Sequence, residues 1–263
     1  HEALTDSMRA HTVDTNYALL NDLFDVQAGL MHRLAKFDDL LFYANQMTDY
    51  AKRAQHSYFL ASCLRYMAIA IIKRFMRCGE YESALKFIDE RVVAGVDHFN
   101  EVHELMHLKC QLLLRLERFE QANEVAQQHL KGECPVTTFY HIYAQSSHYL
   151  GDRSLAKEVL SLWGQLIDED QAVSSLQYHC HRVEYQYTKA KIFAMQGHIA
   201  SVDMYRSAIK SAREEQLLEF VPEILVDMAL AKNLFGLKEE AKKDLEEALT
   251  HVPNHLVYSK LTL

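Results

Sequence analysis

The chain has 263 residues, 49% of them hydrophobic and 24% charged, which is typical of a folded globular protein and argues against extended disorder. Its 28 Lys and Arg against 36 Asp and Glu give a net charge of −8, so it lacks the excess of basic residues on which affinity for nucleic acid depends. Only 8 Gly and 3 Pro interrupt it, too few for the many turns of an all-β protein. The sequence therefore predicts an all-α fold.

Cysteine usage and hydropathy indicate a cytoplasmic protein. The five cysteines lie far apart and form no CxxC pair, a pattern typical of reduced thiols. The most apolar stretch, residues 66–72, is too short to span a bilayer, and two basic residues follow it at once. No secretory signal is found. Because the chain opens on His1 with no initiator Met, we expect it to be a fragment of a larger protein.

Six short turns divide the sequence into helical segments. Each turn is followed by an apolar residue and then by a small or apolar one, and successive turns lie 34 to 46 residues apart. In chain order the turns begin at Ala35, Gly79, Glu117, Gly151, Gly197 and Gly236. A Gly ends the first helix where the backbone becomes left-handed, and the small residue lets the second helix pack closely on the first. The pattern predicts one helix before each turn and one after it.

The clearest copies of the pattern are 79–84 (GEYESA), 236–241 (GLKEEA) and 117–122 (ERFEQA), while 35–40, 151–156 and 197–202 are looser. In the last copy, the small, apolar and terminating positions of the tetratricopeptide repeat are occupied by Gly236, Ala241, Leu245, Ala248 and Pro253. Residues 21–254 thus resemble the tetratricopeptide repeat family. The longer, divergent copies are similar to regulatory repeat regions of bacterial signalling proteins and large transcription activators.

The resemblance implies a right-handed α-solenoid of about six helix pairs plus a C-terminal capping helix. Such pairs bury their apolar faces only against neighbouring pairs, so we expect one repeat domain over residues 1–263. A non-repetitive helical bundle is the alternative. A hinge is expected near residues 131–138, because Pro135 stops one helix and a Thr can cap the next. The apolar tail, residues 252–263, is expected to form the capping helix or to begin a further domain.

In tetratricopeptide proteins, ligands usually meet the inner face of the first helix of each pair. Counting from each turn, this resemblance implies a groove formed by Tyr66, Lys73, Arg77, His107, Gln111, Arg115, His141, Gln145, His148, Tyr149, Tyr187 and Lys191, with Glu184 on the same face. Its Arg and Lys side chains are suited to a carboxylate terminus or to acidic side chains, and its Tyr side chains to stacking. An alternative is that some of these residues only solvate the surface.

The segment 103–107 (HELMH) matches HExxH, in which two His on one helical face hold zinc and the Glu activates water. Catalytic zinc needs a third ligand, and the nearest candidates, Glu120 and Glu124, belong to the helix after the next turn. With 15 His in the chain, chance spacings are common. His179 and His181 flank Cys180 but point in different directions on a helix. We therefore predict no metal, no cofactor and no catalytic residue.

The expected function is that of a protein- or peptide-binding scaffold and not of an enzyme. By resemblance, we expect it to be the regulatory or sensor module of a larger bacterial signalling or transcription-regulating protein, with its partner in the concave groove. Nucleic acid and membrane are not expected partners of this segment. Two alternatives stay open: a zinc-dependent peptidase that uses the HELMH segment, and a self-assembly module that pairs two copies into a homodimer.

Overall fold

A computed structural model describes residues 17–34, 36–53, 55–93, 99–131, 137–169 and 176–251. These ranges contain twelve α-helices and one short 3-10 helix and no strand, which confirms the all-α prediction for the described part of the chain. None of these helices is long and apolar enough to cross a membrane. The predicted hinge near 131–138 lies largely outside the described residues, as do Ala35 and the tail 252–263.

The chain divides into two compact units, residues 1–102 and residues 103–263, and the boundary falls within one helix, α6. The prediction of a single repeat domain stays a prediction. Unit 1 contains α2 (Tyr17–Arg33), α3 (Phe37–Arg53), α4 (Ser57–Arg77) and α5 (Tyr81–Val93). Unit 2 contains the rest of α6 (Phe99–Arg115) and α7 (Phe119–Leu130), η1 (Thr137–Phe139), α8 (Tyr140–Tyr149), α9 (Arg153–Glu169), α10 (Leu176–Met195), α11 (Ser201–Glu214), α12 (Val221–Leu234) and α13 (Lys238–Thr250).

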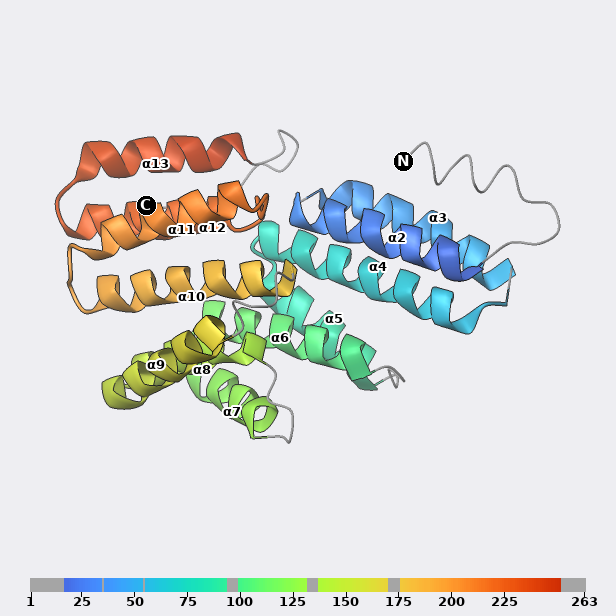
Figure 1. Cartoon of the computed structure of the whole chain (residues 1–263), viewed down its shortest axis with the longest axis horizontal. Coiled ribbons are helices and arrows are strands. Elements are labelled where there is room, and N and C mark those ends of the chain that lie inside the picture. Colours follow the sequence, from blue (N-terminus) through green and yellow to red (C-terminus); the bar gives the residue numbers. More distant parts are fainter. Residues whose placement is uncertain are drawn as a thin grey trace. The chain divides into compact units, whose positions relative to one another are not determined.

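The core of unit 1 forms where α2, α3 and α4 pack side by side (Figure 1). Phe24 of α2 is fully buried, stacks on Tyr43 of α3 with 6.2 Å between ring centroids, and meets Phe59 of α4 edge-on at 5.7 Å. Helix α4 begins where Nδ1 of His56 accepts a hydrogen bond from the backbone N–H of Phe59, at 3.1 Å. The aromatic side chains therefore join three helices through one buried cluster.

In unit 2, most helices pack against their neighbours in the sequence: α8 against α7 and α9, α10 against α9 and α11, and α12 against α11 and α13. Figure 1 shows α10 to α13 running alongside one another. Helix α10 also contacts α8 and α12, so α8, α10 and α12 form one row of helices that each precede a predicted turn. The side of this row that is not packed against α9, α11 and α13 is available to form a site.

Five of the six predicted turns begin within the described residues, and all five have left-handed backbone. Gly79, Gly151, Gly197 and Gly236 have φ angles of 73° to 88°, in the left-handed region, and Glu117 adopts φ 58° without being glycine. A new helix begins within four residues of each of these turn positions. The small or apolar residues that follow are all buried, and they are Ala84, Ala122, Ala156, Val202 and Ala241.

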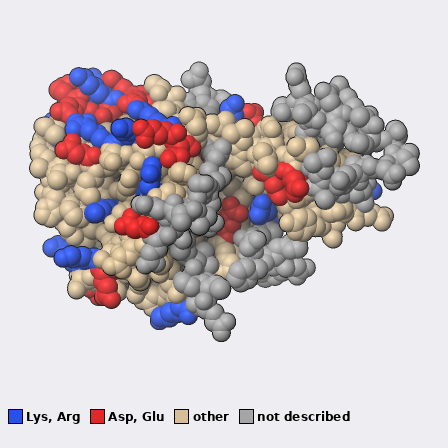
Figure 2. Space-filling view, in the orientation of Figure 1, with Lys and Arg blue, Asp and Glu red and all other residues tan. Residues whose placement is uncertain are grey.

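Opposite charges alternate on the outer surface of α11 and α13 (Figure 2). Arg206 of α11 pairs with Glu240 of α13 at 3.3 Å, and Arg213 pairs with Glu247. Because these pairs are exposed, each contributes at most about 1 kcal/mol to stability. The pairs also determine the charge of this surface, because each basic side chain is neutralised by a neighbouring acidic one.

Candidate functional site

A pocket of about 250 Å³, lined mostly by polar and charged residues, opens in unit 2. Four helices that precede predicted turns, α6, α8, α10 and α12, provide most of its wall. Along each helix the lining residues recur every three or four positions, and two adjacent pairs, Leu114–Arg115 and Tyr187–Thr188, widen the face that they form. The lining residues are Gln111, Leu114, Arg115, Glu117, Phe119, His141, Gln145, Tyr149, Glu184, Tyr187, Thr188, Lys191, Phe220, Glu223 and Asp227.

Seven of the residues predicted for the groove line this pocket: Gln111, Arg115, His141, Gln145, Tyr149, Tyr187 and Lys191. His107 lies beside it, with Nε2 3.4 Å from the side-chain nitrogen of Gln111. His148 is buried in α8 and is not among the lining residues. Burial, followed by the charge of Arg153, lowers the pKa of His148.

The other three predicted residues belong to unit 1. Tyr66 packs edge-on against Phe24 at 5.5 Å, and its hydroxyl donates to the backbone carbonyl of Asp25 at 3.4 Å. The guanidinium of Arg77 lies over the ring of Phe37 at 4.4 Å, and Lys73 is half-buried. Tyr66 and Arg77 thus take part in the packing of unit 1, where Tyr66 joins α4 to α2.

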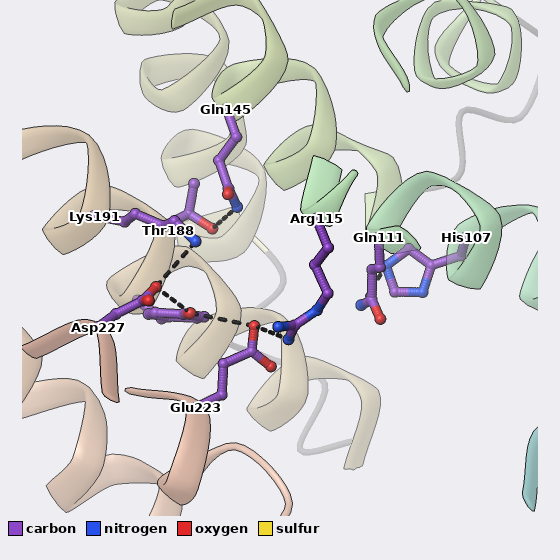
Figure 3. A network of polar contacts seen from close by, with 9 residues as sticks. His107, Gln111, Arg115, Gln145, Thr188, Lys191, Glu223 and Asp227 are labelled. Carbon is purple, nitrogen blue, oxygen red and sulfur yellow. Dashed lines mark hydrogen bonds and ion pairs between the residues drawn. The ribbon is translucent and has the colours of Figure 1, made fainter. Parts of the chain in front are cut away.

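A chain of polar contacts joins α6, α10 and α12 across the pocket (Figure 3). Arg115 of α6 pairs with Glu223 of α12 at 2.7 Å. The hydroxyl of Tyr187 donates to Asp227 at 2.6 Å and lies 3.3 Å from Oε1 of Glu223. Lys191 then pairs with Asp227 at 2.9 Å. Both cations of the pocket wall are therefore held by carboxylates of α12, and an acidic ligand would have to compete with these carboxylates.

Burial and the two carboxylates determine the protonation of this network. Burial raises the pKa of Tyr187, and the negative charges of Asp227 and Glu223 raise it further, so the phenol stays a donor. Burial acts to lower the pKa of Lys191, but Asp227 and Glu223 outweigh it and the pKa is raised. Burial lowers the pKa of His141 to about 4, against the opposing effects of the Thr138 backbone and Glu223. At neutral pH, Lys191 is charged and His141 is neutral.

The formal charges of the pocket wall do not cancel. Two cations, Arg115 and Lys191, face four carboxylates, which are Glu117, Glu184, Glu223 and Asp227. The wall therefore has a formal charge of −2. A ligand that carries positive charge gains from this excess, particularly where the pocket excludes water.

Glu223 and Asp227 complete the network, yet they are not among the predicted groove residues. A signal for Glu223 exists in the sequence, because Glu184 lies 13 residues before Gly197 and Glu223 lies 13 residues before Gly236. Extending the same count to the last repeat places Glu223 on the inner face. Asp227 follows one helical turn later on that face.

The two His of the HELMH segment have different neighbours. Nδ1 of His103 lies 3.1 Å from Nδ1 of His129, whereas the ring of His107 lies against that of His141 with 4.9 Å between centroids. Among the described residues, His107 belongs to a group of possible metal ligands with His141 and Glu184, and neither His103 nor Glu104 is a member of that group.

No family model matches the chain, and no curated protein matches it.

Proposed function

We propose that the chain is a scaffold of tetratricopeptide type, a right-handed α-solenoid of about six helix pairs with a capping helix, and that the pocket of unit 2 binds a segment of another protein. The row formed by α8, α10 and α12 supports this proposal, since the first helices of successive pairs share an inner face in such scaffolds. The lining residues come from that row and from α6.

The ligand of this pocket is a peptide segment with a basic side chain. The pocket wall has an excess of carboxylates, four against two cations, and this excess attracts a positively charged side chain. The volume of about 250 Å³ is slightly below the usual range of small-molecule sites, roughly 300–1,000 Å³, and fits a long side chain with part of its backbone. Phe119 and Tyr149 stack at 4.2 Å between ring centroids and offer an apolar wall for the aliphatic part of Lys or Arg.

Binding at this pocket affects contacts between helices, which suits a regulatory module. A cation that takes over Glu223 releases Arg115 and removes the ion pair between α6 and α12. One that takes over Asp227 removes the pair between α10 and α12. Occupancy thereby changes how three helices are held together, and an attached domain of a larger cytoplasmic signalling or transcription-regulating protein responds to that change.

A peptide-display library tests this function. We expect the wild-type chain to enrich segments that contain Lys or Arg, and Glu223→Gln with Asp227→Asn to weaken binding of the selected peptide at least tenfold, about 1.4 kcal/mol. The control is Glu239→Gln with Glu246→Gln, which removes the same charge from exposed positions on α13. Enrichment of acidic segments, or equal affinity of the pocket variant and the control, would reject the proposal.

A further inference from the structure

Three helices each contribute one potential metal ligand to a single point in unit 2. His107 comes from α6, His141 from α8 and Glu184 from α10, and their ligand atoms all lie within 4.8 Å of one another. His141 and Glu184 are only 7% and 8% exposed. His107 is half-buried. A metal ion held between the three side chains would add to the contact with His181 in offsetting the cost of burying the Glu184 carboxylate.

We propose that His107, His141 and Glu184 bind one Zn²⁺ ion. Two imidazoles and one carboxylate form a donor set found in zinc sites, with an open fourth position. Three atoms at the corners of a triangle with 4.8 Å sides lie about 2.8 Å from its centre, so shifts of less than about 1 Å bring them to zinc-bonding distances of ~2.1 Å. Small side-chain rotations achieve shifts of this size.

The surroundings of the three ligands suit a bound metal. Phe139 lies edge-on to His107 at 5.8 Å, and Trp163 lies 6.2 Å from His141, and both aromatic side chains are fully buried. This apolar shell favours direct ligation over hydration of the ion.

A histidine of the same helix, His181, lies near the carboxylate ligand. Nδ1 of His181 lies 3.8 Å from Oε2 of Glu184, one helical turn away, which is too long for a hydrogen bond but close enough for one to form after a small side-chain rotation. Both His141 and Glu184 also line the pocket, which gives the ion an entry path. The open fourth position is expected to face the pocket.

This zinc site differs from the one that the HELMH segment suggests. Its ligands come from three helices and include neither Glu104 nor His103, which lies against His129. The proposed site also goes beyond the peptide-binding function, because it concerns a different ligand. Metal binding is measured with no peptide present, so failure of either proposal leaves the other intact.

Trp163 makes the site directly observable, because it is the single tryptophan of the chain and lies beside His141. Co²⁺, a paramagnetic stand-in for Zn²⁺, is expected to quench its fluorescence with a one-to-one endpoint. Prior addition of one equivalent of Zn²⁺ should prevent quenching, EDTA should reverse it, and Mg²⁺, which prefers oxygen ligands, should have no effect. Unchanged fluorescence at several equivalents of Co²⁺ would overturn the proposal without any variant.

Three substitutions assign the ligands. His141→Gln and Glu184→Gln are each expected to weaken Zn²⁺ at least tenfold in competition with a chelating indicator, since each removes one ligand. His148→Gln is the control, because His148 is buried on the same helix as His141 but outside the group. Equal zinc affinity in all three variants would overturn the assignment. Circular dichroism identifies a variant that fails to fold. In that case the Co²⁺ titration of the wild type decides whether the site exists.

Discussion

His129 lies between an imidazole and an aromatic ring at the C-terminal end of α7. It stacks on Phe139 at 4.4 Å between ring centroids, and its Nδ1 lies 3.1 Å from that of His103. Burial lowers the pKa of His129, and the charge of a protonated His103 lowers it further. The folded chain therefore prefers the neutral ring.

This preference predicts a pH dependence of stability. The contribution of His129 is fully present above about pH 6.5, where the unfolded His is neutral too, and is lost as the pH falls through the lowered folded pKa. In urea denaturation between pH 7.5 and 5, His129→Gln should lose less unfolding free energy than the wild type. His198→Gln, at an exposed turn, should retain the wild-type slope. Parallel profiles for all three proteins would contradict this prediction.

Two packed helices of unit 2, α12 and α13, share a buried ion pair. Lys232 is 4% exposed and Asp244 8% exposed, and Nζ of the lysine lies 2.7 Å from Oδ2 of the aspartate. Glu240, one turn earlier on α13, lies 3.4 Å from the same ammonium group. The pair therefore joins α12 to α13.

Removing one partner of this pair should cost more than removing both. Asp244→Ala leaves Lys232 buried with only Glu240, and we expect a loss of about 2–4 kcal/mol of unfolding free energy in urea titrations. Lys232→Met with Asp244→Leu should recover most of that loss, because two apolar side chains need no charge partner. A double variant as unstable as the single one would show that the pair itself, and not the orphaned charge, determines stability.

The sequence predicts the helix pairs well because their signals are local. Each left-handed turn and each buried small residue after it depends on a few adjacent positions. Helix α8 is the opposite case. Its sequence, YHIYAQSSHY, shows no apolar stripe, because several of its buried residues are polar. The hydroxyls of two of them, Ser146 and Ser147, accept hydrogen bonds from the side-chain amide of Asn123 on α7, at 2.9 and 3.1 Å. Such pairing depends on how α7 packs on α8.

In the candidate sites too, some features follow from local sequence patterns and others depend on how the helices pack. Seven pocket residues could be predicted because one count from each turn selects one helix face. The same count places His107, His141 and Glu184 on the groove face, but it does not predict that they converge, since they are 34 and 43 residues apart and meet only when three helices pack in one register. The local pattern HELMH instead suggested a zinc site formed by two histidines of a single helix, His103 and His107.

At the scale of the whole molecule, the two proposed ligands of unit 2 should oppose each other. A Zn²⁺ ion held by Glu184 and His141 adds two positive charges to a pocket wall whose formal charge is −2. We expect saturating Zn²⁺ to weaken a basic peptide at least fivefold, about 1 kcal/mol, and the peptide to weaken Zn²⁺ by the same factor. Calorimetric titration of each ligand with and without the other measures both factors, and Glu184→Gln should abolish the coupling. Independent affinities would contradict this prediction.

Glu117 has both an unfavourable backbone conformation and a charge in the pocket wall. Its φ of 58° is a conformation that glycine adopts at lower cost, while its carboxylate adds to the negative charge of the pocket wall. Glu117→Gly should leave the free energy of unfolding unchanged or raise it by up to about 1 kcal/mol. The same substitution should weaken the binding of a basic peptide, because it removes one carboxylate from the pocket wall. Among the turns with left-handed backbone that precede α5, α7, α9, α11 and α13, this is the one without glycine. The glutamate at this turn thus combines a less favourable backbone conformation with a negative charge at the pocket.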